Sequence, residues 1–301
     1  MRDRFSIQLE YYKNLAEETL DSVFSAFNIP NELNNAMRYS VFAGGKRLRP
    51  SLCYAVWEML GGDLSKTSPN CPIRILGASI ELIHTYSLIH DDLPCMDDDD
   101  FRRGKPSNHK MFGEAMAILA GDALLNLAYE NLFSLCKNNP FESQNIIKAA
   151  ELIANCAGAT GMVAGQTLDM NSNNSNDKKQ LKEIHSLKTG MLIRASVLCG
   201  AFLHDISQEC FERLDEFAKD FGILFQITDD LLDECGEEAN LGKTTGKDKA
   251  SGKLTYVSVF GVEVAKSKAN NTAHSAKERI AGFENSEFLA RLVDETLTRI
   301  K

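Results

Sequence analysis

Two clusters of aspartates stand in otherwise apolar stretches of this 301-residue chain. The first is His90-Asp91-Asp92-Leu93-Pro94-Cys95-Met96-Asp97-Asp98-Asp99-Asp100, and the second is Gln226-Ile227-Thr228-Asp229-Asp230-Leu231-Leu232-Asp233. Carboxylates this close repel one another, and carboxylate oxygens with room for water and phosphate are the ligands that Mg²⁺ prefers. The two clusters together therefore predict a magnesium site. For residues 97–100 taken alone, a solvated acidic loop is an equally good interpretation.

Helical spacing sharpens this prediction. In a helix, Asp229, Asp230 and Asp233 share one face, which brings like charges together. A helix that ends near Pro94 leaves Asp91 at its C-terminus, where the helix dipole disfavours anions. A bound divalent cation would offset both penalties.

A second group of residues supplies positive charge. Gly44-Gly45-Lys46-Arg47-Leu48-Arg49-Pro50 is a Gly-Gly turn with three cations just before a predicted helix N-terminus. Backbone N–H groups, the positive end of the helix dipole and forked arginines favour a diphosphate at such a turn. The spacing is not that of a Walker loop. For this segment alone, ordinary surface basic residues are the alternative.

Further cations accompany the aspartate clusters: Arg102, Arg103, Lys188, Lys243 and Lys253. Each alone would be a solvated or charge-balancing residue, so only their joint presence indicates a phosphorylated ligand. His84 precedes Asp91 by seven residues, which is two helical turns, and therefore faces the same way. We expect His84 to join the same site, although a lone histidine on an apolar helix is more often a core residue.

The elements that must position these residues are predicted to be helices. Apolar residues at steps of three and four over residues 5–27 indicate an amphipathic helix, and residues 113–137 are apolar on nearly every side, as in the middle of a bundle. Further helices are predicted at 32–42, 50–60, 73–93, 178–203 and 207–235. Without a strand pattern, a linker or a repeat, residues 1–301 are predicted to form one all-α domain of about ten helices.

Composition narrows the class of function. Hydrophobic residues make up 44% and charged residues 25%, as in soluble globular proteins, and the net charge of −9 argues against nucleic-acid binding. Eight scattered cysteines without a CxxC pair indicate reduced thiols and no cysteine-based zinc site. The N-terminus lacks the apolar run of a signal peptide, and no stretch reaches the ~20 apolar residues of a membrane span. We therefore expect a cytoplasmic protein.

These segments together resemble a known family, the short-chain trans-prenyl diphosphate synthases, and most closely its bacterial farnesyl diphosphate synthases. The likeness covers nearly the whole chain and lies in residues 44–50, 84–97, 102–104, 165–166, 188–190, 226–233 and Lys253. It implies an isoprenoid-synthase fold, in which the helices surround a central cavity, and a homodimer. Many relatives have proline after Thr-Tyr where this chain has Val257; we expect a changed helix start there and no loss of chemistry.

The resemblance also implies a role for each motif. Three Mg²⁺ ions would be held by Asp91 and Asp97, with Asp92 nearby, and by Asp229, supported by Asp230 and Asp233. The diphosphate of isopentenyl diphosphate would be bound by Lys46, Arg49, His84 and Arg103. The allylic diphosphate would be bound by Arg102, Lys188, Lys243 and Lys253, with Thr189 and Gln226 lining the reacting centre.

The implied reaction begins when the allylic diphosphate ionises, assisted by magnesium, lysine and arginine. The double bond of isopentenyl diphosphate then attacks the allylic cation, and the released diphosphate takes the proton. The absence of an obvious general base in the motifs fits that last step.

Product length is predicted from the residues just before the first cluster. Tyr86 and Ser87 stand five and four residues before Asp91, about one to one and a half helical turns away. In relatives, an aromatic residue with a small neighbour at these positions forms the floor of the chain pocket and accompanies a fifteen-carbon product. Farnesyl diphosphate is therefore the first prediction; geranyl and geranylgeranyl diphosphate stay open, as does simple packing of Tyr86.

Two other functions compete with a synthase. A class I terpene synthase also uses an aspartate-rich motif with magnesium, but its second metal motif is usually an Asn/Ser/Glu triad and it needs no second diphosphate grip. A non-catalytic partner subunit would be expected to have eroded aspartate motifs, and both are intact here.

Overall fold

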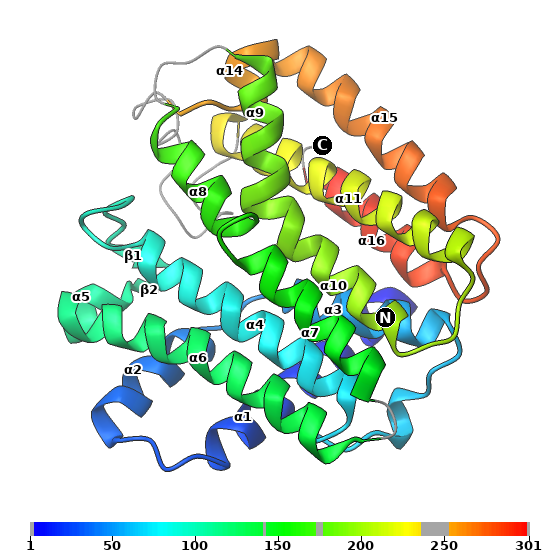
Figure 1. The fold of residues 1–301 in the computed structure, drawn as a ribbon. Coiled ribbons are helices and arrows are strands. Elements are labelled where there is room, and N and C mark those ends of the chain that lie inside the picture. Colours follow the sequence, from blue (N-terminus) through cyan, green and yellow to red (C-terminus); the bar gives the residue numbers. More distant parts are fainter. Residues whose placement is uncertain (1–2, 141–142, 173–176, 236–252, 300–301) are drawn as a thin grey trace. The chain divides into compact units, whose positions relative to one another are not determined.

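The computed structural model describes residues 3–140, 143–172, 177–235 and 253–299, and this part of the chain is almost entirely helical (Figure 1). The predicted all-α class is confirmed. The elements in chain order are α1 (Arg4–Ser25), α2 (Asn31–Val41), α3 (Leu48–Met59), the 3₁₀ turn η1 (Leu64–Lys66), α4 (Pro72–Asp91), β1 (Phe101–Arg102), β2 (Lys105–Pro106), α5 (Asn108–Phe112), α6 (Glu114–Asn138), α7 (Ser143–Ala157), α8 (Met162–Met170), α9 (Lys178–His185), the π-helical turn η2 (Ser186–Gly190), α10 (Met191–Phe202), α11 (Gln208–Cys235), α14 (Tyr256–Phe260), α15 (Val262–Ile280) and α16 (Glu287–Thr298).

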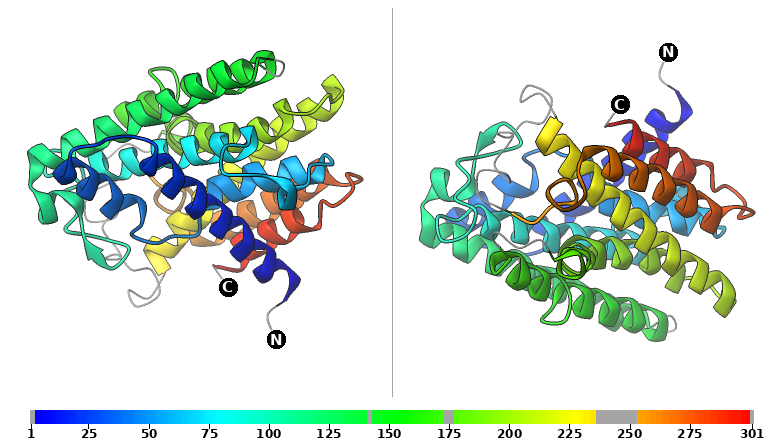
Figure 2. Two further views of the ribbon diagram at one scale, coloured as in Figure 1. Left: turned by 90° about the horizontal axis from the view of Figure 1, so that it is seen from below. Right: turned by 90° about the horizontal axis from the view of Figure 1, so that it is seen from above.

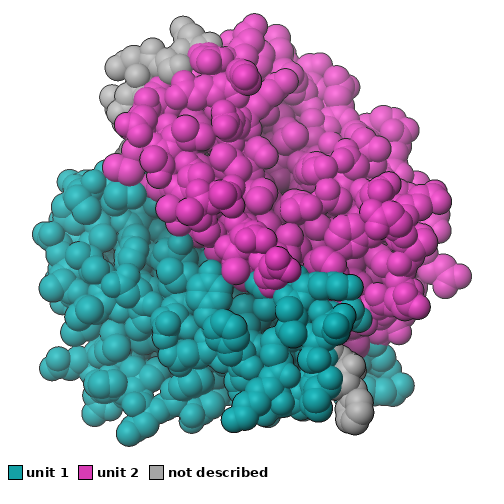
Figure 3. Space-filling model, in the orientation of Figure 1, with its two compact units in different colours: residues 1–54, 63–150 teal, residues 55–62, 151–301 magenta. Residues whose placement is uncertain are grey.

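The chain divides into two compact units. Unit 1 contains residues 1–54 and 63–150, and unit 2 contains residues 55–62 and 151–301 (Figure 3). The single domain expected over residues 1–301 stays a prediction, and each unit is described by itself below.

In unit 1, the long helix α4 packs against α6 and is also contacted by α1 and α2. Its side chains from Ile73 to Ile83 are buried on every face, which explains why the sequence shows no polar stripe there. Gly121 of α6 allows the close approach, because a Cβ at this position would lie 2.1 Å from Nε2 of His90. Burial of apolar surface thus holds the helix that ends at the first aspartate cluster.

In unit 2, α11 is the central helix. It packs along α15 and α10, and the yellow-green ribbon of α11 runs beside the orange ribbon of α15 in Figures 1 and 2. Gly222 of α11 lets the backbone of α11 approach that of η2, since a Cβ there would lie 3.1 Å from Cα of Gly190. The second aspartate cluster occupies the C-terminal turns of α11.

One predicted helix differs in the structure. Residues 178–203 were expected to form a continuous α-helix, but residues 186–190 form the π-helical turn η2 between α9 and α10. Wide turns of this kind often occur at functional sites because they re-aim side chains. Here the turn carries Lys188 and Thr189, which periodicity alone could not distinguish from ordinary helix.

Two further expectations concern α14 and membrane spans. Helix α14 begins at Tyr256, where Thr255 caps it through a reciprocal pair of hydrogen bonds with Ser258.

One helical stretch, residues 143–170, is long and apolar enough to cross a membrane by length and composition. A turn at residues 158–161 interrupts it, and it carries Lys148, Glu151 and Asp169. It is therefore weak support for a membrane span.

Candidate active site

The first aspartate cluster folds back on the end of α4. The backbone amide of Asp97 donates to the carbonyl oxygen of Asp91 at 2.9 Å. The backbone amide of Asp99 donates to the carbonyl oxygen of Asp92 at 3.2 Å. These amides satisfy carbonyl groups that the end of a helix leaves without partners. As a result, Asp91 and Asp97 are neighbours in space although five residues separate them in the chain.

Asp92 has a different environment from Asp91 and Asp97. Its side chain is 3% exposed, and Nε of Arg102 donates to both of its carboxylate oxygens, at 3.1 and 3.2 Å. Burial raises the pKa of Asp92, and the hydrogen bonds from Arg102 oppose that rise. Asp99 lies 3.5 Å from the same guanidinium. Asp92 therefore fixes the orientation of Arg102, while Asp91 and Asp97 are the better-placed pair for a metal ion.

The Gly-Gly turn and Arg103 lie together in unit 1. Arg103 donates from Nη1 to the carbonyl oxygen of Gly44, and a Cβ at Gly45 would lie 2.8 Å from its guanidinium carbon. Glycine at position 45 thus leaves the space that Arg103 occupies. The structure brings the predicted diphosphate grip of residues 44–49 next to the arginine that follows the acidic loop.

His84 belongs to this basic cluster. Burial lowers the pKa of His84 well below its usual range, and the positive charges of Arg49 and Arg103 lower it further. The imidazole is therefore neutral at pH 7 and acts as a hydrogen-bonding group. Lys46, the remaining member of the predicted set, has an exposed side chain.

The basic turn also contains a residue with a structural role. Arg47 is 2% exposed, with Nη1 bound to Glu81 at 3.0 Å and Nη2 bound to the carbonyl oxygen of Val41 at 2.6 Å. Its φ of 49° is in the left-handed region, which is uncommon for a side-chain-bearing residue. Charge and spacing alone do not distinguish Arg47 from Lys46 and Arg49, although the family resemblance leaves Arg47 out of the predicted diphosphate set. The buried ion pair with Glu81 is the physical reason that Arg47 has a structural role.

The predicted floor residues lie on α4 as expected from their spacing. Tyr86 is 7% exposed, and its ring lies 5.7 Å from that of His90. Burial raises the pKa of Tyr86 to about 12, with a further contribution from Tyr129 of α6. Ser87 donates to the carbonyl oxygen of His84 at 2.9 Å. A partly open pocket next to Asp92 and Arg102 measures only about 20 Å³, room for roughly one water, so it is too small for a prenyl chain.

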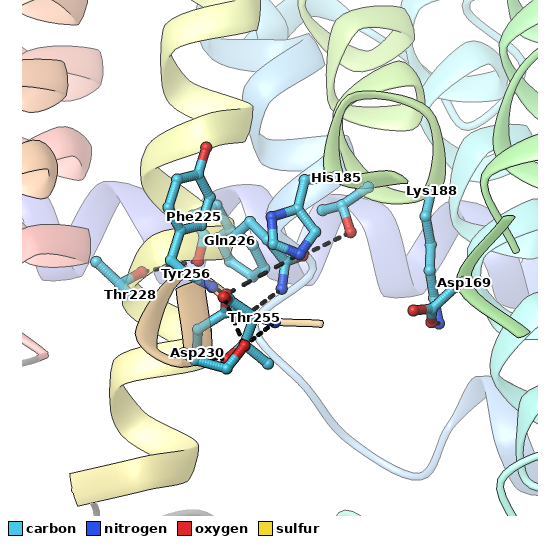
Figure 4. Close-up of polar contacts among 11 residues, drawn as sticks. Asp169, His185, Lys188, Phe225, Gln226, Thr228, Asp230, Thr255 and Tyr256 are labelled. Atoms are coloured by element: carbon cyan, nitrogen blue, oxygen red, sulfur yellow. Dashed lines mark hydrogen bonds and ion pairs between the residues drawn. The ribbon is translucent and has the colours of Figure 1, made fainter. Parts of the chain in front are cut away.

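In unit 2, Gln226, Asp230 and Thr189 form one hydrogen-bonded network (Figure 4). Thr189 Oγ1 donates to Gln226 Oε1 at 2.9 Å, and Gln226 Nε2 donates to Asp230 Oδ1 at 2.8 Å. The backbone amide of Tyr256 donates to the other carboxylate oxygen of Asp230 at 2.7 Å. Both oxygens of Asp230 are thereby engaged: this carboxylate ties α14 to α11, and η2 joins the network through the bond between Thr189 and Gln226. The role predicted for Asp230, support of a magnesium ion at Asp229, stays a prediction.

His185 packs against the same carboxylate. Its Nε2 lies 4.0 Å from Asp230 Oδ2, and its ring lies 5.2 Å from that of Tyr256. Burial lowers the pKa of His185 to about 4, while Asp169 opposes and Lys188 adds to the shift. At pH 7 the imidazole is therefore neutral, and its contact with Asp230 is not an ion pair.

Two predicted site residues have charged partners that sequence reasoning missed. Lys188 Nζ lies 2.6 Å from Asp169 Oδ2, and Arg299 Nη2 lies 3.3 Å from Asp229 Oδ1. The position of Asp169, four residues after Gly165 on α8, was an available signal because both share a helix face. Arg299 gave no local signal in the sequence.

The remaining predicted residues are placed as follows. Lys243 lies outside the described residues. Lys253 lies just before α14 and is partly buried, and Asp233 is 7% exposed near the end of α11. Within unit 1 the structure gathers Asp91, Asp92, Asp97, Arg102, Arg103, Arg49 and His84. Within unit 2 it gathers Lys188, Thr189, Gln226 and Asp230.

Comparison with known proteins gives consistent matches over nearly the whole chain. The family model for polyprenyl synthetase matches residues 30–294. The large subunit 1 of a chloroplastic heterodimeric geranylgeranyl pyrophosphate synthase from Arabidopsis thaliana is 42% identical over 277 residues, covering 91% of this chain and 73% of that protein. The crystal structure of a geranyltransferase from Legionella pneumophila has a TM-score of 0.85 at 31% identity, covering 99% of both chains. A geranyltransferase from Helicobacter pylori, complexed with magnesium and isoprenyl diphosphate, has a TM-score of 0.80 at 31% identity, covering 99% of this chain and 98% of that one.

Proposed function

Because this chain belongs to the polyprenyl synthetase family, we propose that it is a synthase that joins an allylic diphosphate to isopentenyl diphosphate. The observation that carries the proposal is the fold-back of the acidic loop, in which the amide of Asp97 binds the carbonyl of Asp91. It places two carboxylates beside a cluster of arginines within unit 1. Anionic ligands with a divalent cation are the chemistry that such a combination suits.

The residues fit a magnesium cofactor. Asp91 and Asp97 would hold it in unit 1 and Asp229 in unit 2, with three ions in total as the family resemblance implies. Each offers only carboxylate oxygens, the donor type that Mg²⁺ prefers. When bound, magnesium supplies Lewis-acid neutralisation of the departing diphosphate. Asp229 lies 3.3 Å from Nη2 of Arg299, so a bound magnesium ion would share or replace this cationic partner.

The basic residues of unit 1 are proposed to bind the diphosphate of isopentenyl diphosphate. Arg49 and Arg103 supply forked cations, Lys46 an exposed ammonium, and His84 a neutral imidazole. A neutral His84 donates a hydrogen bond to a phosphate oxygen without adding charge, so the arginines carry the electrostatic attraction.

The allylic diphosphate is proposed to bind Arg102, Lys188, Lys243 and Lys253. Lys188 Nζ lies 2.6 Å from Asp169, so binding of the diphosphate would exchange one anionic partner for another. Thr189 and Gln226 are fixed by their mutual hydrogen bond and would line the reacting centre. None of these groups is a free general base, and we propose that the released diphosphate accepts the proton.

Two product lengths have specific support. The Arabidopsis relative is named for geranylgeranyl pyrophosphate, which favours a twenty-carbon product. The buried Tyr86, just over one turn before Asp91, favours the fifteen-carbon product predicted first. The Legionella and Helicobacter proteins are named for transfer of the ten-carbon geranyl group. We place the twenty-carbon product first because the relatives that share 42–44% identity carry that name.

We further propose a cytoplasmic homodimer. Helix α6 exposes Leu119 at 54% and Phe133 at 74%, apolar area that a second subunit would cover. Cys53, Cys156 and Cys199 are buried, and none of the described cysteines forms a disulfide, as in a reducing compartment. The Arabidopsis relative is named as a heterodimer, so light scattering with purified protein tests the assembly directly.

A product assay tests the function. Purified protein is incubated with isopentenyl diphosphate, dimethylallyl diphosphate and Mg²⁺, with EDTA as the control, and chain lengths are read by mass spectrometry. A metal-dependent twenty-carbon diphosphate supports the proposal in full, and a fifteen-carbon one moves the product to farnesyl diphosphate. Folded protein without any condensation activity would contradict the proposal and favour a partner-subunit role.

A further inference from the structure

Beside the β1–β2 hairpin, an imidazole lies next to two carboxylates that the proposed reaction does not use. One ligand atom from each of Asp98, Asp100 and His109 lies within 4.8 Å of the others. We propose that these three residues bind a divalent transition-metal ion, with Zn²⁺ as the best match, at a site separate from the magnesium carboxylates Asp91 and Asp97.

The histidine is the feature that points to a ligand. His109 is 6% exposed, and its Nε2 has no hydrogen-bond partner in the structure. Its Nδ1 lies 3.1 Å from Oγ of Ser107, which is itself 1% exposed. When Nδ1–H donates to Ser107, the lone pair of Nε2 is left for a cation. Metal-binding histidines are typically oriented by such an outer hydrogen bond.

The backbone holds the two aspartates near this imidazole. The amide of Asp98 donates to the carbonyl of Leu93 at 3.1 Å, and the residue adopts a left-handed φ of 49°. The amide of Ser107 donates to the carbonyl of Asp100 at 2.8 Å, which ties Asp100 to the segment that carries His109. Both aspartate side chains are exposed, so each can change rotamer at little cost in packing.

Lys110 also contacts the cluster, with Nζ 2.7 Å from Oδ1 of Asp100. Its ammonium neutralises part of the negative charge and so weakens attraction for a purely ionic partner. The imidazole nitrogen then decides which ion binds, because nitrogen donors suit Zn²⁺ and similar ions, whereas Mg²⁺ prefers oxygen. With Zn²⁺ at ~2.0–2.2 Å from each ligand, tetrahedral ligand atoms stand ~3.4 Å apart, so binding requires movements of ~1 Å.

A bound ion would join the acidic loop to α5. Asp98 directly follows Asp97, and His109 belongs to α5, so the ion would restrict the loop that carries Asp97. The proposal rests on the geometry of unit 1 alone and does not depend on the prenyl-transfer reaction.

Isothermal titration with Zn²⁺ in excess Mg²⁺ tests the site, because Mg²⁺ then occupies the all-oxygen sites. We expect one equivalent of Zn²⁺ to bind to wild type. Ser107→Ala should weaken binding by about 10-fold, and His109→Gln by more. Co²⁺ in place of Zn²⁺ should give a visible absorption spectrum that depends on His109. Glu114→Gln, an exposed carboxylate at the start of α6, is the matched control and should bind as wild type.

Because His109 is buried, Asp98→Asn serves as a second variant with an exposed substitution. Zn²⁺ should raise the melting temperature of wild type more than that of Asp98→Asn. No Zn²⁺ uptake by wild type in excess Mg²⁺ would overturn the proposal. Equal uptake by wild type, Asp98→Asn and His109→Gln would place the ion elsewhere and overturn it as well.

Discussion

The backbone amide of Asp97 donates a 2.9 Å hydrogen bond to the carbonyl oxygen of Asp91. This bond closes the acidic loop onto the end of α4 and makes neighbours of the two residues at the ends of the DDxxxxD motif. The intervening Asp92 turns inward to Arg102 instead. The spacing of the motif therefore lets a tight loop fold back on the helix end and bring the two ends of the motif together.

This relationship predicts that the outer carboxylates matter more for catalysis than for folding. Asp97→Asn should lower kcat by roughly 10²–10³-fold, because one magnesium ligand is lost from the transition state. Asp91→Ala and Asp229→Ala should likewise abolish most activity. Thermal unfolding should be unchanged or slightly improved, since a like charge is removed. Steady-state kinetics with Glu114→Gln as control checks this, and full activity in Asp91→Ala or Asp229→Ala would contradict the assignment.

Gly165→Ala should displace Lys188 by pressing on its backbone, with no change to its side chain. A Cβ at Gly165 would lie 2.2 Å from the backbone nitrogen of Lys188, so η2 must shift. A displacement of ~1 Å at a substrate-binding group can cost about 10²-fold in rate. We expect a higher KM for the allylic diphosphate together with a lower kcat. Val163→Ala, at an exposed position on the same helix, is the control. Kinetics of Gly165→Ala identical to those of wild type would show that the close approach of α8 to η2 is not required.

Tyr86→Ala should lengthen the product if Tyr86 closes the chain pocket. Removing a buried aromatic ring also costs roughly 3–5 kcal/mol of unfolding free energy, so the variant should melt earlier. Tyr86→Phe keeps the ring and should leave chain length unchanged. Mass spectrometry of the products decides the matter. An unaltered product distribution in Tyr86→Ala would mean that Tyr86 only packs against α6.

The buried His185 predicts a pH dependence of stability. Its pKa is about 4 in the folded protein, against an ordinary value of 6.5. Below pH 6.5 the unfolded chain binds the proton more readily, so the contribution of neutral His185 to stability falls as pH drops from 6.5 to about 4. Above pH 6.5 that contribution is fully present.

Chemical denaturation of wild type and His185→Gln checks this, because the variant cannot titrate at that position. The difference between their unfolding free energies should shift by a few kcal/mol, about 3, in favour of the variant between pH 6.5 and 4. If the difference between the two unfolding free energies is constant over this pH range, His185 titrates with its ordinary pKa in the folded protein.

Much of the architecture followed from local patterns. The steps of three and four over residues 5–27 predicted α1, and the apolar run of residues 113–137 predicted α6 almost to its ends. The aspartate clusters, the Gly-Gly turn and Lys188-Thr189 were recognisable because their chemistry depends on residue type and short spacing. The family comparison agrees with that chemistry.

Other features depended on which distant residues meet. Arg47 and Arg49 are two positions apart in one motif, yet Arg47 is buried against Glu81 whereas Arg49 is only partly buried. Lys188 is paired with Asp169 because Gly165 lets α8 reach the π-helical turn. Residue type and spacing determined which groups carry charge and which segments are helical, since both are local properties. Their partners were decided by helix packing, because burial and close backbone approach exist only once the chain has folded.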